Sequence, residues 1–167
     1  MLNYLKKINL PNFSDERGNF IKFPDLLLPD FKLIEWKEEF LSISSKNVIR
    51  GMHFQVPPYD HDKFVCCIQG SILDVIVDLH KGQSYGKLYV NTLHASEGIF
   101  IPRGFAHGFL SLENDSIAFY RTNSLYSHDH DTGVLWSSLN FDWDCTQPII
   151  SKRDQTFLPF DKFNSPF

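Results

Sequence analysis

The sequence predicts an all-β fold, an antiparallel sandwich or barrel with only short helical segments near its ends. Stretches of alternating apolar and polar residues follow one another at roughly ten-residue spacing, with Gly and Pro between them. Few stretches hold a helical period. Aromatic residues make up 15% of the chain and include 16 Phe, which favours sheets with large buried clusters. At 167 residues we expect one domain, 1–167, with a sizeable core.

In the first half of the chain, apolar alternation and turn residues predict seven elements. They are a short strand and connector over 1–12, a turn at 15–20 leading into a strand at 19–23, a loop or helical turn at 26–29, a strand over 31–40 that contains Trp36, an extended segment at 42–45, and strands over 48–55 and 63–68.

In the second half, the strand over 71–79 alternates cleanly between two faces. We expect the face with Val75 and Val77 in the core, and the face with Asp74 on a pocket or in solvent. The remaining elements are strands over 88–93 and 116–123, a loop at 129–133, a segment at 135–143 that closes the sheet, and a short helix that begins near Ser151 as N-cap.

Polar residues in the strand at 48–55 indicate a catalytic or binding pocket. Strict alternation would place Arg50 and His53 on opposite faces, but Gly51 lies between them, and a glycine in a strand often marks a bulge. A bulge would let both side chains share a pocket, and Lys63, which opens the next strand, would add an ammonium. Such a set suits proton removal next to a carbonyl, with His as base and Lys beside the enolate. The alternative is a structural histidine with two surface cations.

Charge and cysteine content exclude several classes of protein. A net charge of -4 argues against nucleic acid or an anionic membrane as the main partner, although an anionic ligand remains compatible with local arginines. No apolar run approaches membrane-spanning length, and the N-terminus lacks a signal-peptide core. Cys66, Cys67 and Cys145 form neither a disulfide framework nor a zinc motif. We therefore expect a cytoplasmic protein with buried, inert thiols.

Seven histidines raise the question of a metal site. The spacing Gly98-x3-Pro102-x-Gly104-x2-His107 resembles the second half of the cupin signature, whose His ligates a metal in many members. The first half lacks its second His and its Glu after His53, and a catalytic metal needs about three protein ligands. We therefore expect no metal and no cofactor. The remaining loop residues are expected to be solvated: His61, His128, His130 and Arg103.

Several motifs follow one another over roughly residues 13–155. They are Asp15-x-Arg17-Gly18-x-Phe20, Val48-Ile-Arg-Gly-Met-His53-Phe-Gln, Lys63-x-Val, Gly70-x-Ile-x-Asp74-Val-x-Val-Asp78-Leu, Ile101-Pro-x-Gly-x-Ala-His107-Gly-Phe, Tyr120-(x5)-Tyr126 and Ser151-Lys-Arg-Asp154. Together they resemble the dTDP-4-dehydrorhamnose 3,5-epimerase family. That resemblance implies a cupin-type jelly-roll barrel, metal-free and usually homodimeric, which epimerises nucleotide-linked 4-keto-6-deoxy sugars next to the ketone.

The resemblance implies roles for individual residues. His53 would be the general base, Asp154 its carboxylate partner, Tyr120 the acid on the opposite ring face, and Lys63 the cation near the ketone. Two proton carriers on opposite faces are needed, because a proton returned to the side it left gives no inversion. The positions implied to bind nucleotide or sugar are Arg17, Phe20, Lys22, Arg50, His107, Tyr126 and Arg153.

The chain departs from the family pattern where the nucleotide is read. A family Glu falls on Lys22, the pair that reads thymine falls on Glu38-x-Phe40, and a Lys near the diphosphate becomes Arg153. We therefore expect the reaction type to be kept and the choice of base to be relaxed or redirected. The turn at 15–20 exposes Arg17, and in the family this segment crosses to the other subunit of a homodimer.

The leading hypothesis is a cofactor-independent epimerase of a nucleoside-diphosphate 4-keto-6-deoxy sugar, at C3, C5 or both, in the synthesis of cell-surface glycan precursors such as those of lipopolysaccharide O-antigen. One alternative is a sugar-nucleotide 3,4-ketoisomerase, which would move the carbonyl instead. Others are a metal-dependent cupin oxygenase using His53, His61 and His107, and a carbohydrate-binding cupin without activity.

Overall fold

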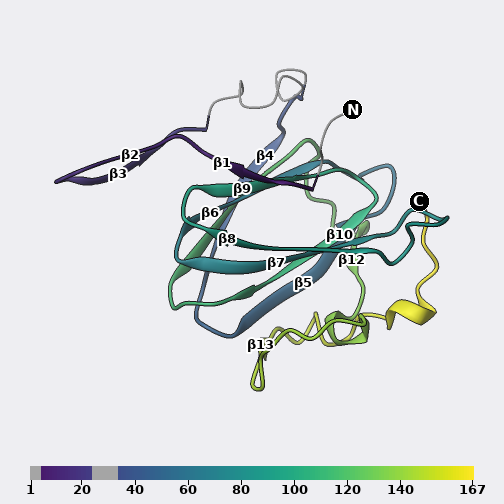
Figure 1. Ribbon diagram of the computed structural model, residues 1–167. Helices are drawn as coiled ribbons and strands as arrows, with labels where there is room; N and C mark the ends of the chain where they lie inside the picture. The colour runs from purple at the N-terminus through teal and green to yellow at the C-terminus, as the bar shows by residue number, and fades with distance from the viewer. Residues whose placement is uncertain (1–4, 24–33) are drawn as a thin grey trace.

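The computed structural model describes residues 5–23 and 34–167, and the regular secondary structure of these residues consists almost entirely of strands (Figure 1). The strands are β1 (Lys7–Asn9), β2 (Asn12–Asp15), β3 (Gly18–Ile21), β4 (Glu38–Ser44), β5 (Val48–Gln55), β6 (Lys63–Gln69), β7 (Ser71–Asp78), β8 (Leu88–His94), β9 (Glu97–Ile101), β10 (Phe105–Ser111), β11 (Ser116–Thr122), β12 (Asp131–Gly133) and β13 (Ile149–Ile150). Two 3-10 turns, η2 (Trp136–Ser138) and η3 (Phe160–Lys162), lie in the last quarter of the chain.

Two sheets form the body of the protein. One has the order β1-β9-β6-β11-β4 and the other β12-β5-β10-β7-β8, and all these pairings are antiparallel. β13 adds to β5 as a parallel strand. This arrangement confirms the predicted all-β jelly roll; within the described residues the two sheets face each other without joining into one closed barrel. No helix among those residues is long and apolar enough to cross a bilayer.

Apolar side chains pack in three layers. The central layer, between the sheets, takes Val65 and Ile99 from one sheet and Ile76 and Phe109 from the other. A second layer lies on the outer face of the β5–β10–β7 sheet, under the segment 134–167, and a third covers the outer face of β6 and β9. Strand β7 is therefore buried on both faces, where the sequence predicted a pocket or solvent on one of them. The C-terminal segment supplies the extra cover (Figure 1).

The C-terminal third differs most from the sequence prediction. Residues 131–133, predicted as loop, form β12 on the edge of β5. The segment 135–143, predicted to close the sheet, has no strand and instead inserts Leu139 and Trp143 into the outer apolar layer. Leu139 and Trp143 are thus buried in the core, although the backbone of this segment does not pair with a strand. Ser151 does accept the Asp154 N–H at 3.0 Å, as an N-cap would, but the segment forms turns rather than a helix.

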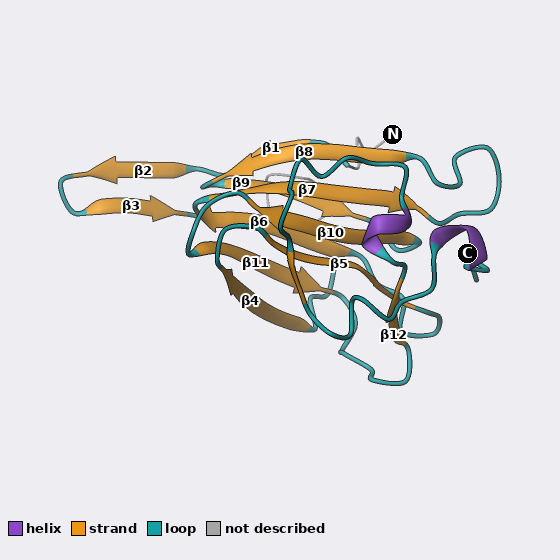
Figure 2. Cartoon of the chain, turned by 90° about the horizontal axis from the view of Figure 1, so that it is seen from below, coloured by secondary structure: helices purple, strands orange, loops and turns teal. Residues whose placement is uncertain are grey.

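The N-terminal region forms a hairpin that projects from the body (Figure 2). β3 ends at Ile21, earlier than predicted, and Trp36 precedes β4, which begins at Glu38. The predicted strand over 31–40 is therefore wrong for 34–37. The predicted loop or helical turn at 26–29, and positions 31–33, lie outside the described residues.

Candidate active site

An open cavity of about 370 Å³ lies between the two sheets. Its wall combines side chains from β4, β5, β6, β10 and β11 with the loops that follow β5 and β11. The residues that line it include Glu38, Phe40, Ser42, Arg50, His53, Gln55, His61, Lys63, His107, Tyr120, Tyr126, Asp131 and Arg153.

A bulge at Gly51 gives Arg50 and His53 a common side. On the neighbouring strand β10, His107 pairs with His53 and Phe109 pairs with Arg50. The interval between these two pairs is three residues in β5 and two in β10, so β5 carries one extra residue there. Gly51 has φ +142°, and a Cβ there would stand 2.5 Å from the Gly108 Cα. Both the left-handed backbone and the close approach require glycine. The predicted bulge is confirmed, and both polar side chains line the cavity.

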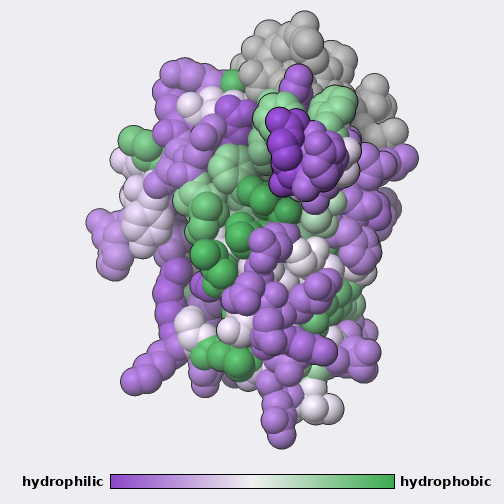
Figure 3. All heavy atoms as spheres, turned by 90° about the vertical axis from the view of Figure 1, so that its left-hand side faces the viewer, coloured by the Kyte–Doolittle hydropathy of each residue, from purple (hydrophilic) through white to green (hydrophobic). Residues whose placement is uncertain are grey.

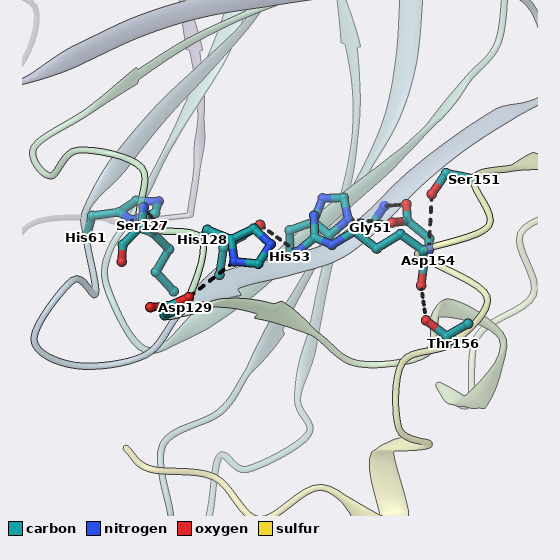
Figure 4. Close-up of polar contacts among 12 residues, drawn as sticks. Gly51, His53, His61, Ser127, His128, Asp129, Ser151, Asp154 and Thr156 are labelled. Carbon is teal, nitrogen blue, oxygen red and sulfur yellow. Dashed lines mark hydrogen bonds and ion pairs between the residues drawn. The ribbon is translucent and has the colours of Figure 1, made fainter.

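His53 is held by a carboxylate from the far end of the sequence. Its Nε2 lies 2.9 Å from Oδ1 of Asp154, and Oδ2 of the same carboxylate accepts the Gly51 N–H at 3.1 Å (Figure 4). Burial raises the pKa of Asp154, but hydrogen bonds and charge from His53, Gly51 and Ser151 outweigh it and lower that pKa overall. The carboxylate is therefore ionised and fixes His53 with its Nε2 proton toward Asp154, leaving Nδ1 as the basic atom.

Lys63 opens β6 with its side chain in the cavity wall, 8% exposed. Burial lowers the pKa of its ammonium to about 8, although the charges of Asp131 and Asp74 oppose the shift. The ammonium form therefore still predominates at pH 7 and can stabilise a developing negative charge.

Tyr120 of β11 is buried, and burial raises its pKa above the ordinary value, which keeps the phenol protonated. Its OH lies 3.4 Å from Ser42 Oγ, and its ring packs edge-on at 6.4 Å from that of His107. His107 in turn bonds to the buried Asp74 carboxylate, with Nε2 to Oδ1 at 2.6 Å. Burial lowers the pKa of His107 despite Asp74. The cavity thus presents a proton donor in Tyr120 and a base in His53.

The other predicted binding residues separate into two groups. Arg50, Tyr126 and Arg153 line the cavity with His107; Arg50 donates to Ser44 Oγ, and Arg153 pairs with Asp131. Three others lie on the projecting hairpin, away from this chain's own cavity: Arg17, Phe20 and Lys22. There Arg17 is exposed and bonded to Asp15, and Lys22 Nζ stands 5.6 Å from the centre of the Phe20 ring.

Sequence reasoning gave neither His61 nor Gln55 a place in the epimerase site. His61, expected to be solvated, lines the cavity, and burial together with the charge of Lys63 lowers its pKa to about 3, so it is neutral. Gln55 is 4% exposed, and its amide joins the two loops at the cavity mouth: Nε2 donates to Tyr59 O and Leu125 O, and Oε1 accepts the Ser127 N–H. A glutamine ending an apolar strand, just before a Pro-Pro turn, was the available signal.

The remaining histidines and cysteines do not form a site. His128 is exposed, as expected, and His130 bonds to Ser127. Cys66 and Cys67 are buried on opposite faces of β6, and burial raises the pKa of each thiol to about 12, as befits inert cysteines. Within residues 5–23 and 34–167 no group of three or more His, Cys, Asp or Glu side chains is placed to hold a metal ion.

A jelly roll whose cavity combines a carboxylate-bound histidine, a buried lysine and a protonated tyrosine fits an isomerase that moves protons at carbon. The family model for dTDP-4-dehydrorhamnose 3,5-epimerase matches residues 2–162. The chain belongs to this family of carbohydrate epimerases.

Individual relatives agree with that assignment. The dTDP-4-dehydrorhamnose 3,5-epimerase of Shigella flexneri is 36% identical over 162 residues, 90% of each chain. A crystal structure of the Bacillus anthracis epimerase with TDP and PPi bound superposes with a TM-score of 0.82 at 34% identity, over 90% of this chain and 91% of that one. The Legionella pneumophila enzyme in complex with dTDP-4-keto-L-rhamnose gives 0.86 at 25% identity, over 95% and 88%. Neither the ketoisomerase nor the oxygenase alternative is favoured.

Proposed function

We propose that the protein epimerises a nucleoside-diphosphate 4-keto-6-deoxy sugar at C3, C5 or both, with His53 as the base. The observation that carries this is the His53–Asp154 pair, in which the imidazole of His53 lines the same cavity as Lys63 and Tyr120. No cofactor is required, because a carbon next to a ketone loses a proton once a base and a cation near the oxygen are in place.

The reaction follows from the protonation states of the site. His53 Nδ1 takes the proton from the ring carbon, and the C–H electron pair moves into the enolate, whose oxygen the Lys63 ammonium stabilises. Asp154 stabilises the imidazolium that forms, as an orienting carboxylate does in a hydrolase triad. Tyr120 then donates its phenolic proton to the opposite face of the same carbon. The configuration inverts, and proton exchange with water returns both groups to their starting states.

We propose that the cavity cations hold the diphosphate. Arg50 and Arg153 line the wall, and guanidinium groups suit phosphate oxygens. His107 and Tyr126 would contact the sugar and nucleotide. Arg153 is half exposed, so its guanidinium could contact a phosphate in addition to Asp131 or leave Asp131 for the phosphate.

We propose a homodimer in which the hairpin of one subunit completes the site of the other. Support comes from the hairpin itself, which projects with Arg17, Phe13 and Phe20 exposed. Hydrophobic side chains also gather on the face from which it projects (Figure 3), and Leu41 and Ile43 on the edge strand β4 are more than half exposed. Arg17 would then reach the neighbour's nucleotide, with Phe20 and Lys22 beside it.

The cellular setting is also a proposal. The free thiols of Cys66, Cys67 and Cys145 suit a cytoplasmic enzyme, and a deoxysugar nucleotide is the form in which a cell prepares sugars for surface glycans such as O-antigen.

The decisive experiment incubates the protein with a 4-keto-6-deoxy sugar nucleotide in heavy water and follows the sugar by NMR. We expect deuterium at the carbon next to the ketone and an inverted configuration there. A carbonyl moved to C3 would identify a ketoisomerase, and binding without any exchange would identify a carbohydrate-binding protein.

A further inference from the structure

Charge is unevenly neutralised in the cavity wall. Three cations line it, Arg50, Lys63 and Arg153, and so do two carboxylates. The carboxylate of Asp131 is neutralised by Arg153. Glu38 is different: among the described residues no Lys, Arg or His lies within ion-pair distance of it. A cavity proposed to take a dianionic ligand therefore keeps one negative side chain without a cation.

Glu38 is held in place by the loop that follows β11. One of its oxygens, Oε2, accepts the Tyr126 N–H at 3.0 Å, while Oε1 has no protein partner among the described residues. Across the sheet, Glu38 pairs with Thr122, which pairs with Lys63, so two strand spacings, about 10 Å, separate the backbones of Glu38 and Lys63. If the ketone of the sugar lies beside Lys63, Glu38 is too far away to contact the reacting carbons. Glu38 would instead contact another part of the nucleotide sugar.

The free oxygen of Glu38 needs a hydrogen-bond donor once a ligand displaces water. A buried carboxylate oxygen left unpaired costs affinity, and a phosphate placed there would be repelled. Phe40, on the same face of β4, offers only a ring, which stacks on Tyr120 with centroids 4.7 Å apart. At this end of the cavity, the donor must come from the nucleoside.

We infer that Glu38 determines nucleoside specificity, and that the site prefers a nucleoside diphosphate that offers donors which thymidine lacks. The inference rests on the proposed function and narrows its substrate. Cytosine and guanine carry an exocyclic amino group, and ribose carries a 2′-hydroxyl. Thymidine has neither; its one base N–H lies between two carbonyl oxygens that repel an approaching carboxylate.

Calorimetry with CDP, dCDP, GDP, UDP and dTDP tests this and identifies the donor. We expect CDP or GDP to bind at least tenfold more tightly than dTDP. Equal binding of CDP and dCDP, both above UDP and dTDP, identifies the amino group. Equal binding of CDP and UDP, both above dCDP and dTDP, identifies the 2′-hydroxyl. If dTDP binds as well as or better than all the others, the inference is wrong.

Glu38→Gln separates recognition from structure, because its amide can donate to a thymine carbonyl. It should weaken the preferred nucleotide about tenfold and leave dTDP unchanged or tighter, with an unaltered melting temperature. The matched control is Glu39→Gln, on the opposite face of β4, where the carboxylate pairs with Arg121 at 2.8 Å. An equal loss for every nucleotide, or the same change in Glu39→Gln, would assign Glu38 a structural role and overturn the inference.

The proposed function is tested separately by deuterium exchange into the sugar. A protein that exchanges deuterium but prefers dTDP refutes only the inference about Glu38. A protein that exchanges with no sugar nucleotide, including those of the preferred base, refutes the function itself.

Discussion

Asp154 Oδ2 accepts the backbone N–H of Gly51 while Asp154 Oδ1 binds the imidazole of His53, although these partners are 103 and 101 residues away in sequence. One carboxylate therefore fixes both the bulge in β5 and the side chain that the bulge redirects. The parallel pairing of β13 with β5 brings Asp154 to this position. The local geometry of β5 and the orientation of the proposed base, His53, therefore depend on the same carboxylate.

The first prediction concerns that pair. His53→Ala should lose nearly all deuterium exchange at the sugar while nucleotide binding persists, because only the base is removed. Asp154→Asn should lose about 10²-fold or more, as orienting carboxylates do when neutralised. Stopped NMR time courses in heavy water measure both. The control is His128→Ala, an exposed histidine outside the cavity lining; exchange in His53→Ala at the rate of this control would rule out His53 as base.

How much of this site follows from sequence depends on the residue. The bulge at Gly51 follows from a local rule, because a glycine inside a strand acts over a few residues. Lys63 shares the cavity with His53 because β6 lies in the sheet that faces β5, and the order of strands in the sequence does not encode that arrangement. Asp154 reaches His53 through a C-terminal segment that the strand pattern read as sheet closure and helix, so only the family resemblance connected the two. Gln55 and His61 act through loop geometry, which periodicity does not encode. In the proposed homodimer, the place of Arg17 would depend on the second chain.

The second prediction concerns the pH dependence of turnover. In the proposed mechanism Lys63 must be protonated to stabilise the enolate, and burial lowers its pKa to about 8. On the alkaline side, activity should therefore fall as pH rises through about 8, in a limb with unit slope. Lys63→Arg keeps its charge throughout that range, so whatever rate it retains should show no such limb. A limb that persists in this variant would assign the titration to another group.

A third prediction concerns assembly. Sedimentation should give a homodimer, and Arg17→Ala should weaken nucleotide binding tenfold or more without lowering the melting temperature. The Arg17 side chain is 84% exposed, and among the described residues of its own subunit it bonds only to Asp15. Lys46→Ala removes an exposed cation elsewhere and serves as control. A fully active monomer would contradict the proposal, as would unchanged nucleotide affinity in Arg17→Ala.

The fourth prediction concerns the cavity mouth. The Gln55 amide has two N–H donors, and the two shortest contacts of its Nε2 are Tyr59 O at 2.9 Å and Leu125 O at 3.1 Å, while Oε1 takes the Ser127 N–H at 2.6 Å. Gln55→Leu would remove all three of these hydrogen bonds and leave the Ser127 N–H without its acceptor. We expect a loss of about 1–3 kcal/mol in stability and a raised KM, because the loops that carry His61 and Tyr126 would separate.

Gln69→Leu is the matched control for this change. Gln69 lies at the opposite end of β6 from Lys63 and donates one exposed hydrogen bond to Asp115 O. Its loss should leave KM unchanged and stability within about 0.5 kcal/mol, as surface substitutions usually do. Chemical denaturation and steady-state kinetics distinguish the two variants. If Gln55→Leu loses stability but the folded fraction keeps the wild-type KM, Gln55 supports the fold without positioning the loops that bind substrate.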